Sequence, residues 1–498
     1  MRKRDDFSRV FSNSFFLIAD DVIRAIITLL IIAILARYFD LETFGDYSFI
    51  FALCSIFQIM VGMGMNPIII REVAKRPEES EEIFNASFFI RILFSLITFG
   101  VIVFFISLST LSPEVIRATY VCSVGVIAVF FSNLPYCIFQ GHQKMGFVTV
   151  VGMVNSVVYL VATLAFIKFG AGLQEIFFPV IFGNLTGFLL GLYILGKKFF
   201  IPKFSINFKL CQYLIKESYL LGISRILRNL SFRFDTLLIK MIRGSIEVAL
   251  FSSAYQLFLQ LAVIPRNVVM SMFPVFSKRY AKRADSLNFA FEECFKIFVV
   301  CLIPFVIFLF FFAKDIVLLL FGEKLIKSVP VFRILSMAWG FMFISVLFMN
   351  TLIAIGRQNL TTLCVTSALI VNIILDVILI PIMGFYGAGM ATFAAEVILT
   401  FSTYKFISKS LMPLAFNRLL VGPATGGLFL ALSCYLGSQM SSLIWLFVLT
   451  MIGFFGYIGS LILFKTLSSY EYEKGKEIFR SIFIRRIPVT ENKTFKSQ

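Results

Sequence analysis

Histidine and charge are the scarce components of this 498-residue sequence. His142 is the only histidine, and charged residues make up 15% of the chain. A single histidine excludes a multi-histidine zinc site and leaves almost no room for histidine-based catalysis. The eight cysteines form no Cys-x-x-Cys pair, and most fall in apolar stretches, where cysteine behaves as a small apolar residue. The sequence therefore indicates neither a disulfide framework nor a Cys/His metal motif.

Apolar residues dominate instead, at 59% of the chain with 63 phenylalanines. A soluble protein of this length could not bury so much apolar surface, whereas about 20 apolar residues cross a bilayer core as a helix. We predict an all-α polytopic membrane protein with fourteen spans and an uncleaved first span. The spans are 12–36, 44–66, 86–107, 116–138, 148–167, 176–195, 217–239, 248–270, 292–313, 331–355, 361–380, 386–404, 419–436 and 443–464.

The connections between these spans are short, and the longest are 67–85, 196–216 and 271–291. They leave no room for a soluble catalytic domain. With the N-terminus inside, the inner segments hold 29 Lys and Arg residues and the outer segments hold 7. The positive-inside rule therefore places both termini in the cytoplasm of a cell-membrane protein. It also explains the net charge of +17 without nucleic acid as a partner.

The two halves of the chain repeat. Gly170-Ala171-Gly172 matches Gly387-Ala388-Gly389, and Gly45-Asp46-Tyr47-Ser48 aligns with Ala249-Leu250-Phe251-Ser252. Six spans form each repeat, so both lobes have the same orientation, as in transporters with a central path. We predict an N-terminal lobe at 1–200, a C-terminal lobe at 201–410, two further spans at 411–466, and a basic cytoplasmic tail at 467–498. An amphipathic helix after Tyr470 and an ordinary positive-inside tail both fit that last segment.

Charged residues inside the spans are the main functional signal, since each costs about 2.5–3.5 kcal/mol at mid-bilayer on insertion scales. Arg91, Lys296 and Arg266 lie near inner span ends, where snorkelling is the simpler interpretation. The deep set comprises Asp20, Asp21 and Arg24 in span 1, Arg225, Arg228, Arg233 and Asp235 in span 7, Asp376 in span 11, and Glu396 in span 12.

The arginines of spans 1 and 7 suggest an anion site. Asp20, Asp21 and Arg24 share one helical face, and the repeat places Arg24 on Arg228. One interpretation is an internal salt bridge that locks the lobes together. The other is a cationic cavity for a phosphate or pyrophosphate head group, which the forked donors of arginine suit.

A second group of side chains, rich in oxygen, is predicted nearer the outer surface. Asp235, Asp376 and Thr392 reach one depth on three spans, and Asn372 and Glu396 each add an oxygen one turn deeper. Such a set without imidazole or thiolate suits a hard cation or a proton. A hydrogen-bonded polar contact between helices is the alternative.

Three segments resemble the MOP superfamily of exporters, in particular its polysaccharide biosynthesis flippases: ARYFDLETFGDYSFIFAL at 36–53, NPIIIREVAK at 66–75, and the stretch from DTLLIKMIRG at 235 to KRYAK at 282. The resemblance covers spans 1–12, and fourteen spans also resemble the lipid II flippases. It implies a sodium site at Asp235, Asn372, Asp376, Thr392 and the Ala388 carbonyl. It also implies that Arg24 and Arg228 grip a pyrophosphate, while Arg225 and Arg233 have no counterpart.

These features favour a flippase for a polyprenyl-linked oligosaccharide, driven by Na⁺ or H⁺ and needing no other cofactor. A multidrug extruder of the same superfamily is the alternative, although two extra spans and paired arginines argue against it. The short outer loops argue against a glycan polymerase or glycosyltransferase, and a scaffold would not explain the deep charges. The expected partners are the lipid-linked glycan and membrane lipids, with polymerases or glycosyltransferases of the same pathway as further candidates.

Overall fold

Helices make up almost all of the described chain. The computed structural model describes the backbone of residues 2–203, 205–282, 284–411, 416–439, 443–464 and 466. The side chains of 2–18, 220, 224, 225, 227, 228, 231, 271, 273–275, 277–282, 284–286, 416–418 and 443–447 lie outside the description. No strand occurs in these ranges, and the predicted amphipathic segment after Tyr470 lies outside them.

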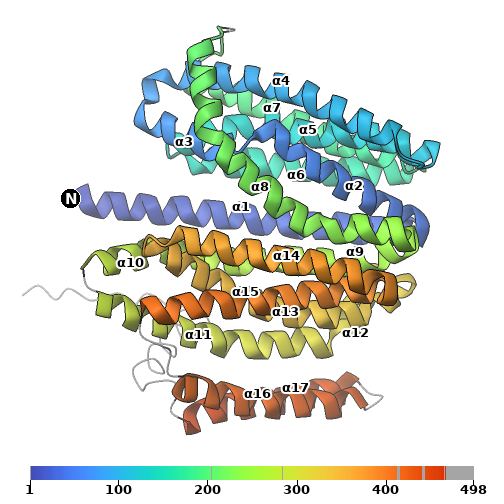
Figure 1. Ribbon diagram of the computed structural model, residues 1–498, viewed down its shortest axis with the longest axis vertical. Helices are drawn as coiled ribbons and strands as arrows, with labels where there is room; N and C mark the ends of the chain where they lie inside the picture. The colour runs from blue at the N-terminus through green and yellow to red at the C-terminus, as the bar shows by residue number, and fades with distance from the viewer. Residues whose placement is uncertain are drawn as a thin grey trace, which may run out of the picture. The chain divides into compact units, whose positions relative to one another are not determined.

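The long helices follow one another with short connections (Figure 1). They are α1 (Arg2–Tyr38), α2 (Leu41–Gly62), α3 (Met65–Lys75), α4 (Ser80–Ser107), α5 (Pro113–Gly141), α6 (Met145–Lys168), α7 (Phe178–Lys198), α8 (Phe208–Arg243), α9 (Ser245–Leu261), α10 (Val263–Lys282), α11 (Ala284–Phe311), α12 (Ala313–Phe321), α13 (Val329–Ala354), α14 (Gln358–Met383), α15 (Phe385–Ser410), α16 (Phe416–Gln439) and α17 (Leu443–Leu463). The 3₁₀ turns η1 (Pro77–Glu79), η2 (Glu175–Phe177) and η3 (Glu323–Ser328) precede α4, α7 and α13.

All fourteen predicted spans coincide with helical segments, which confirms the fold class. Among the described residues, 11 helical stretches are long and apolar enough to cross a membrane. The charged α1 and α8 are not among these stretches. Large side chains such as Phe104, Leu96 and Leu428 are more than 60% exposed, as expected where a helix faces lipid. The chain is therefore a multi-pass membrane protein.

Two spans are broken, and residues predicted to connect spans are helical. Span 2 is divided into α2 and α3 at Met63 and Gly64, and span 8 into α9 and α10 at Ala262. Residues 67–75 and 271–282, predicted as connections, extend these helices. Gly64 has a φ of 70° and packs closely on α8, since a Cβ there would lie 2.6 Å from the Gly222 nitrogen. A side chain at Gly64 would therefore be excluded by both backbone conformation and space.

Arg91 on α4 supports the broken span and does not snorkel. Its side chain is completely buried, and Nη2 donates to Asn66 Oδ1 at 2.8 Å, while Nη1 donates to the Phe130 carbonyl. These contacts join α3, α4 and α5. The snorkelling interpretation is therefore wrong for Arg91. It is also wrong for Lys296, which is buried and pairs with Glu293 at 2.8 Å on α11.

The chain divides into two compact units. The first contains α1–α10 and α12–α15, and the second contains α11 from Phe289 onward with α16 and α17. Within the second unit the Tyr457 hydroxyl donates to the Val300 carbonyl at 2.7 Å. Although predicted with spans 7–12, most of α11 thus groups with α16 and α17. The domain boundaries at 200, 410 and 466 stay predictions.

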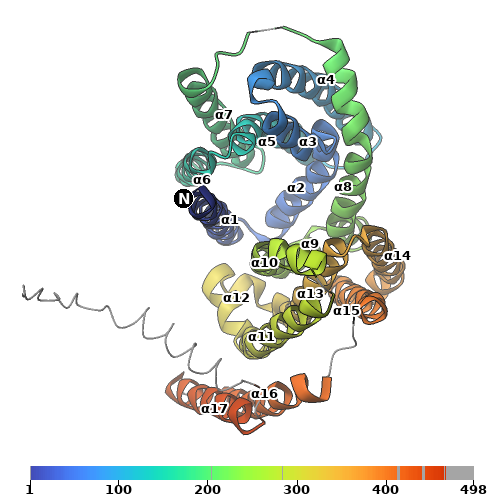
Figure 2. The same cartoon turned by 90° about the vertical axis from the view of Figure 1, so that its left-hand side faces the viewer.

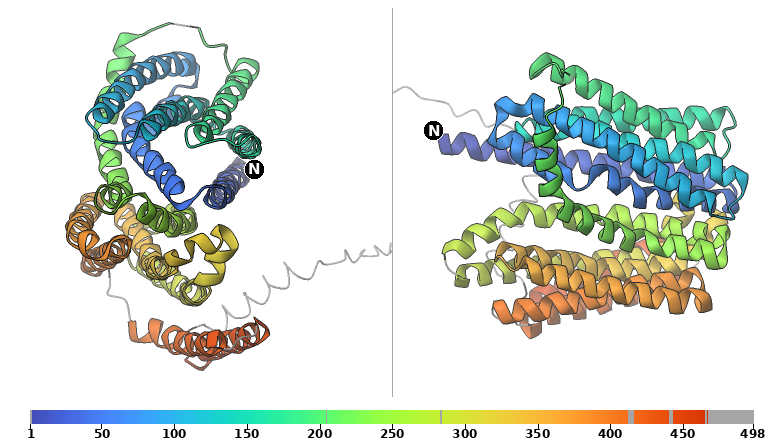
Figure 3. Two further views of the ribbon diagram at one scale, coloured as in Figure 1. Left: turned by 90° about the vertical axis from the view of Figure 1, so that its right-hand side faces the viewer. Right: turned by 45° about the horizontal axis from the view of Figure 1, so that its top comes forward.

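In the first unit α8 packs on both predicted lobes. It contacts α2, α3 and α4 on one side and α9, α14 and α15 on the other. Figure 2 looks along the helix axes and shows α1–α7 in one group and α9, α10 and α12–α15 in another, with α8 running along both. Figure 3 gives the opposite view and shows the same course of α8. Any change between the two groups must therefore be accommodated by α8.

The alternation of these helices yields a test of topology. With the N-terminus inside, the turns after Lys144 and Lys203 lie in the cytoplasm, whereas those after Gly172 and Gly244 lie outside. Alkaline phosphatase fused at the first two positions should be inactive, and at the last two it should be active. A green fluorescent protein at the same positions should give the opposite pattern. Active phosphatase after Lys144 would contradict the assigned orientation.

Candidate functional site

Arg24 is held in the first unit by a carboxylate on its own helix. Arg24 Nε lies 2.9 Å from Asp20 Oδ2, one turn earlier on α1. The Asp20 side chain is buried, whereas that of Arg24 remains 32% exposed. The Tyr136 ring on α5 lies below the guanidinium, with its centroid 5.2 Å from Cζ. The pair therefore presents a fixed guanidinium with part of its surface open.

Asp21 is not part of this pair and contacts α10 in the other helix group. Its Oδ2 accepts a hydrogen bond from Arg266 Nη2 at 2.9 Å, which joins α1 to α10. The predicted shared face of Asp20, Asp21 and Arg24 is thus occupied by two separate ion pairs. The Arg266 side chain is 60% exposed, so the snorkelling interpretation of Arg266 stays a prediction beside this ion pair. A contact between residues 245 positions apart left no signal in the local sequence.

The four charged residues of span 7 lie along α8, where the structure describes two of their side chains. The side chains of Arg225 and Arg228 lie outside the described residues. Arg233 faces α2, where its guanidinium lies 5.9 Å from the Phe51 ring centroid. Asn229, one turn earlier, donates to the Ser55 carbonyl of α2 at 2.7 Å. This face of α8 therefore packs against the first helix group.

Asp235 lies on the other face of α8 and forms the acidic cluster, here Asp235, Asp376 and Thr392. Thr392 Oγ1 on α15 donates to Asp235 Oδ2 at 3.1 Å, and the carboxyl group of Asp376 on α14 lies next to that of Asp235. Asn372 on α14 and Ala388 on α15 are buried one turn before Asp376 and Thr392. The structure thus brings together the three side chains predicted to reach one depth.

Tyr255 on α9 lies near the acidic cluster in the chain's interior. It is buried, and its side chain lies in the neighbourhood of Asp235, Asp376, Glu396 and Arg233. Sequence analysis did not single out Tyr255. The repeat offers a signal for it, because Phe251 and Tyr255 on α9 stack with centroids 5.0 Å apart, as do Tyr47 and Phe51 on α2 at 6.4 Å. The two stacked pairs occupy matching positions, 204 residues apart in the chain.

The acidic cluster has the composition of a hard-cation or proton site. Asp235 Oδ1 and both carboxylate oxygens of Asp376 are buried without a hydrogen-bond partner. Unpaired carboxylate oxygens are costly, so a proton or a cation with oxygen ligands fits them. No group of three His, Cys, Asp or Glu side chains suited to a metal occurs in the described part of the chain. The residues therefore fit Na⁺ or H⁺ and not a zinc-type site.

Two further sets of contacts join the helix groups near the predicted outer ends. Asp46 on α2 pairs with Lys240 on α8 and accepts a 2.7 Å hydrogen bond from the Ser245 hydroxyl on α9. Arg37 at the end of α1 donates to the carbonyls of the last turn of α12, with Nε 2.9 Å from the Leu320 oxygen. Such contacts would have to separate if the groups moved apart at this end.

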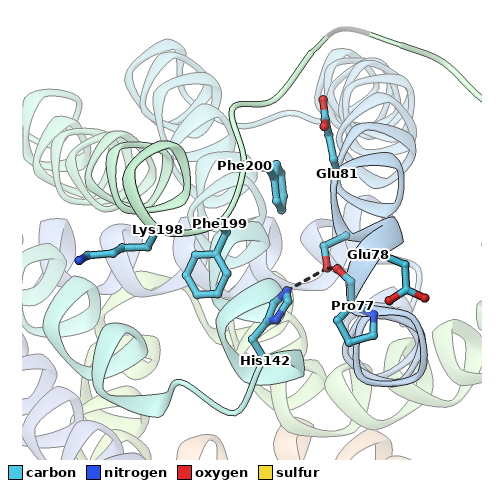
Figure 4. Close-up of a pocket in the computed structure, with 8 residues that line it drawn as sticks. Pro77, Glu78, Glu81, His142, Lys198, Phe199 and Phe200 are labelled. Carbon is cyan, nitrogen blue, oxygen red and sulfur yellow. Dashed lines mark hydrogen bonds between the residues drawn. The ribbon is translucent and has the colours of Figure 1, made fainter.

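The only histidine lines a separate pocket of about 360 Å³ at the predicted cytoplasmic ends of α4, α5 and α7 (Figure 4). His142 Nε2 lies 2.9 Å from the Ser80 hydroxyl, and that hydroxyl donates to the Pro77 carbonyl. Burial, aided by Lys144, lowers the pKa of His142, so the neutral imidazole is favoured. Phe199 packs on the ring, and this histidine therefore has a structural environment.

Comparisons with known proteins agree with this architecture. The model of the family "Polysaccharide biosynthesis protein" matches residues 10–279, and the MatE model matches 221–378. A Shigella flexneri protein named "Putative O-antigen transporter" is 23% identical over 396 residues, which is 77% of this chain and 94% of that protein. An uncharacterized membrane protein of Methanocaldococcus jannaschii is 28% identical over 141 residues, which is 28% of each chain.

Solved structures share the fold. The lipid II flippase MurJ in an inward closed conformation has a TM-score of 0.70 at 16% identity, covering 96% of this chain and 99% of that one. An inward-facing multidrug resistance MATE transporter of the MOP superfamily has a TM-score of 0.62 at 16% identity, covering 80% and 95%. At such identity the likeness concerns the fold and not the cargo.

The unpaired oxygens of the acidic cluster predict that a bound cation stabilises the purified protein. A ligand at 100 times its Kd stabilises the folded state by about 2.7 kcal/mol. The melting temperature should therefore be higher in NaCl than in choline chloride, and Asp376→Asn should remove the difference. Asp315→Asn, at an exposed carboxylate on α12, is the matched control and should keep it. Equal sodium stabilisation of Asp376→Asn and wild type would rule out this site.

Proposed function

We propose that this chain, which belongs to the polysaccharide biosynthesis protein family of the MOP superfamily, flips a polyprenyl-(pyro)phosphate-linked oligosaccharide across the cell membrane. Transport would run from the cytoplasmic to the outer leaflet and supply cell-surface polysaccharide synthesis. As a transporter, the chain has no reaction to catalyse. The arrangement of Arg24, a fixed and partly exposed cation within a span, is the observation that carries this proposal.

An anionic head group is the ligand that this arginine suits. Guanidinium groups bind phosphate oxygens with two parallel, charge-assisted hydrogen bonds, and these are stronger away from bulk water. Asp20 lies at the Nε side of Arg24, and 32% of the Arg24 side chain stays exposed for a ligand. Arg228, the repeat equivalent on α8, would supply the second cation. Arg24 on α1 and Arg228 on α8 would bind a pyrophosphate between these two helices.

Cation coupling through the acidic cluster is the second part of the proposal. Asp235, Asp376 and Thr392 would hold Na⁺ or H⁺, with Asn372 and the Ala388 carbonyl as further oxygen ligands. Asp235 lies on α8, the same helix as Arg228, so ion binding and substrate binding act on one element. Because α8 packs on both helix groups, a change in its position would alter the access of the site.

A multidrug extruder of the same superfamily is the second candidate. The match of the MatE model to residues 221–378 favours it, as does the fold shared with MATE transporters. Extruded drugs are mostly cations, however, and Arg24 would repel them. The family match over residues 10–279 also covers the helix that carries Arg24. The flippase is therefore the better-supported function, with glycosyltransferases and polymerases of the pathway as proposed partners.

Removal of either proposed phosphate-binding arginine should abolish most transport. A charge-assisted hydrogen bond is worth about 1.5–3 kcal/mol, so Arg24→Ala or Arg228→Ala should slow flipping at least about tenfold. The measurement is the flipping of a fluorescent polyprenyl-diphosphate oligosaccharide in proteoliposomes. Arg117→Ala, which removes an exposed arginine of α5, is the control and should transport normally. Normal flipping by both alanine variants would refute the proposed anion site.

Neutralisation of the acidic cluster should uncouple transport from the ion gradient. Asp376→Asn removes a ligand charge, so an inward sodium or proton gradient should no longer accelerate flipping in proteoliposomes. Downhill flipping without a gradient should persist, since Asp376 is not proposed to touch the glycan lipid. If the gradient accelerates Asp376→Asn as much as wild type, the coupling ion binds elsewhere. A drug substrate carried instead of the glycan lipid would support the extruder.

A further inference from the structure

A glycine on α6 lies directly against the Asp20–Arg24 pair. A Cβ built on Gly152 would lie 2.3 Å from Asp20 Oδ1 and 2.4 Å from Arg24 Nη2. Both distances are far below the closest contact that a real Cβ makes. Gly152 is buried, and α1 and α6 pack along one another. The absence of a side chain at this position therefore creates the space in which the ion pair sits.

The guanidinium is enclosed from a second side by Tyr136. This tyrosine is buried on α5 and places its ring under Arg24, with 5.2 Å between Cζ and the ring centroid. Asp20 on α1, Tyr136 on α5 and Gly152 on α6 thus bound the guanidinium on three sides, while 32% of the Arg24 side chain stays exposed. These three residues fix the plane of the guanidinium group, and part of that group stays accessible.

We propose that Gly152 and Tyr136 are positioning residues for the anion-binding arginine. They hold the Arg24 fork in one orientation, so that a pyrophosphate meets an aligned pair of donors and not a freely rotating side chain. Fixing the side chain before binding reduces the conformational entropy that the ligand would otherwise cost. The inference rests on the proposed function and adds two residues that determine affinity without touching the substrate.

Replacing Gly152 by alanine should affect the ion pair at the site but not the folding of the protein. The atoms that an alanine methyl would displace are the far ends of two flexible side chains, which can move without disturbing the helix backbone. Alanine is also a better helix former than glycine. Gly152→Ala should therefore fold normally and yet push the Asp20–Arg24 pair out of its place. The substitution therefore tests the position of the guanidinium separately from the stability of the helix.

The same helix offers a matched control. Gly146, in the first turns of α6, has no atom within 4 Å of a built Cβ. Gly146→Ala therefore makes the same chemical change in the same helix without contacting Arg24. Tyr136→Leu is a second test that does not depend on a new methyl group, because it removes the ring beneath the guanidinium and keeps an apolar side chain.

The experiment measures the Kd of purified full-length protein for farnesyl diphosphate, with farnesol as the uncharged control and melting temperature as the check of folding. Gly152→Ala and Tyr136→Leu should each weaken diphosphate binding about tenfold, within the range of couplings between contacting residues. Gly146→Ala should bind like wild type, and farnesol binding should be the same in every variant.

A double-mutant cycle tests whether Gly152 acts through Arg24. Arg24→Lys removes the planar guanidinium whose Nη2 meets the Gly152 position, so adding Gly152→Ala in that background should change the Kd less than about twofold. An undiminished tenfold loss in that background would overturn the positioning role. Equal affinity of Gly152→Ala, Gly146→Ala and wild type would overturn it while the proposed function stands. Absence of diphosphate binding by wild type would overturn both.

Discussion

The lack of water in the bilayer core is the constraint on which the other features of this protein depend, because every charge inside a span must find its partner within the chain. The chain meets this demand in several ways. Arg91 is fully buried and donates to a carbonyl and an amide, Arg24 pairs with Asp20, and Arg233 lies against aromatic rings. In the acidic cluster three carboxylate oxygens on two neighbouring side chains are buried without a hydrogen-bond partner. This concentration of unpaired carboxylate oxygens makes the cluster the candidate place for an ion.

The sequence predicts the helices well because their signals are local. Runs of apolar residues define the spans, and the Asn-x-x-x-Asp and Ala-x-x-x-Thr spacings place residues one turn apart, so α14 and α15 could be located with their oxygen side chains. Partners distant in the chain are not encoded locally. Arg91 was interpreted as snorkelling because its acceptors are an amide 25 positions away and a backbone carbonyl, and neither has a signature in a hydropathy pattern. The Asp21–Arg266 pair was missed for the same reason, and the predicted anion site stays partly untested because two of its arginines lie outside the described side chains.

Arg233 and Asp235 lie two residues apart on α8 and contact different helix groups. Residues two apart on a helix point in nearly opposite directions. Arg233 accordingly contacts Phe51 on α2, while Asp235 accepts a hydrogen bond from Thr392 on α15. One turn of α8 therefore touches both helix groups. On the proposed mechanism, a cation bound at the acidic cluster would change the field at Arg233 and so act on the contact of α8 with α2 without any long pathway.

The contacts between the groups are individually weak enough for such a change to matter. Exposed ion pairs contribute about 0–1 kcal/mol, and Asp21–Arg266 is of this kind. Asp46–Lys240 is better shielded but is a single pair. Reversing a two-state equilibrium from 1:99 to 99:1 requires about 5.5 kcal/mol of differential binding. A cation at 100 times its Kd supplies only about 2.7 kcal/mol, even if it binds one state alone. On the proposed mechanism an ion at that saturation would supply about half of such a free energy, and the head group at Arg24 and Arg228 would supply the rest. Transport would then need both ligands.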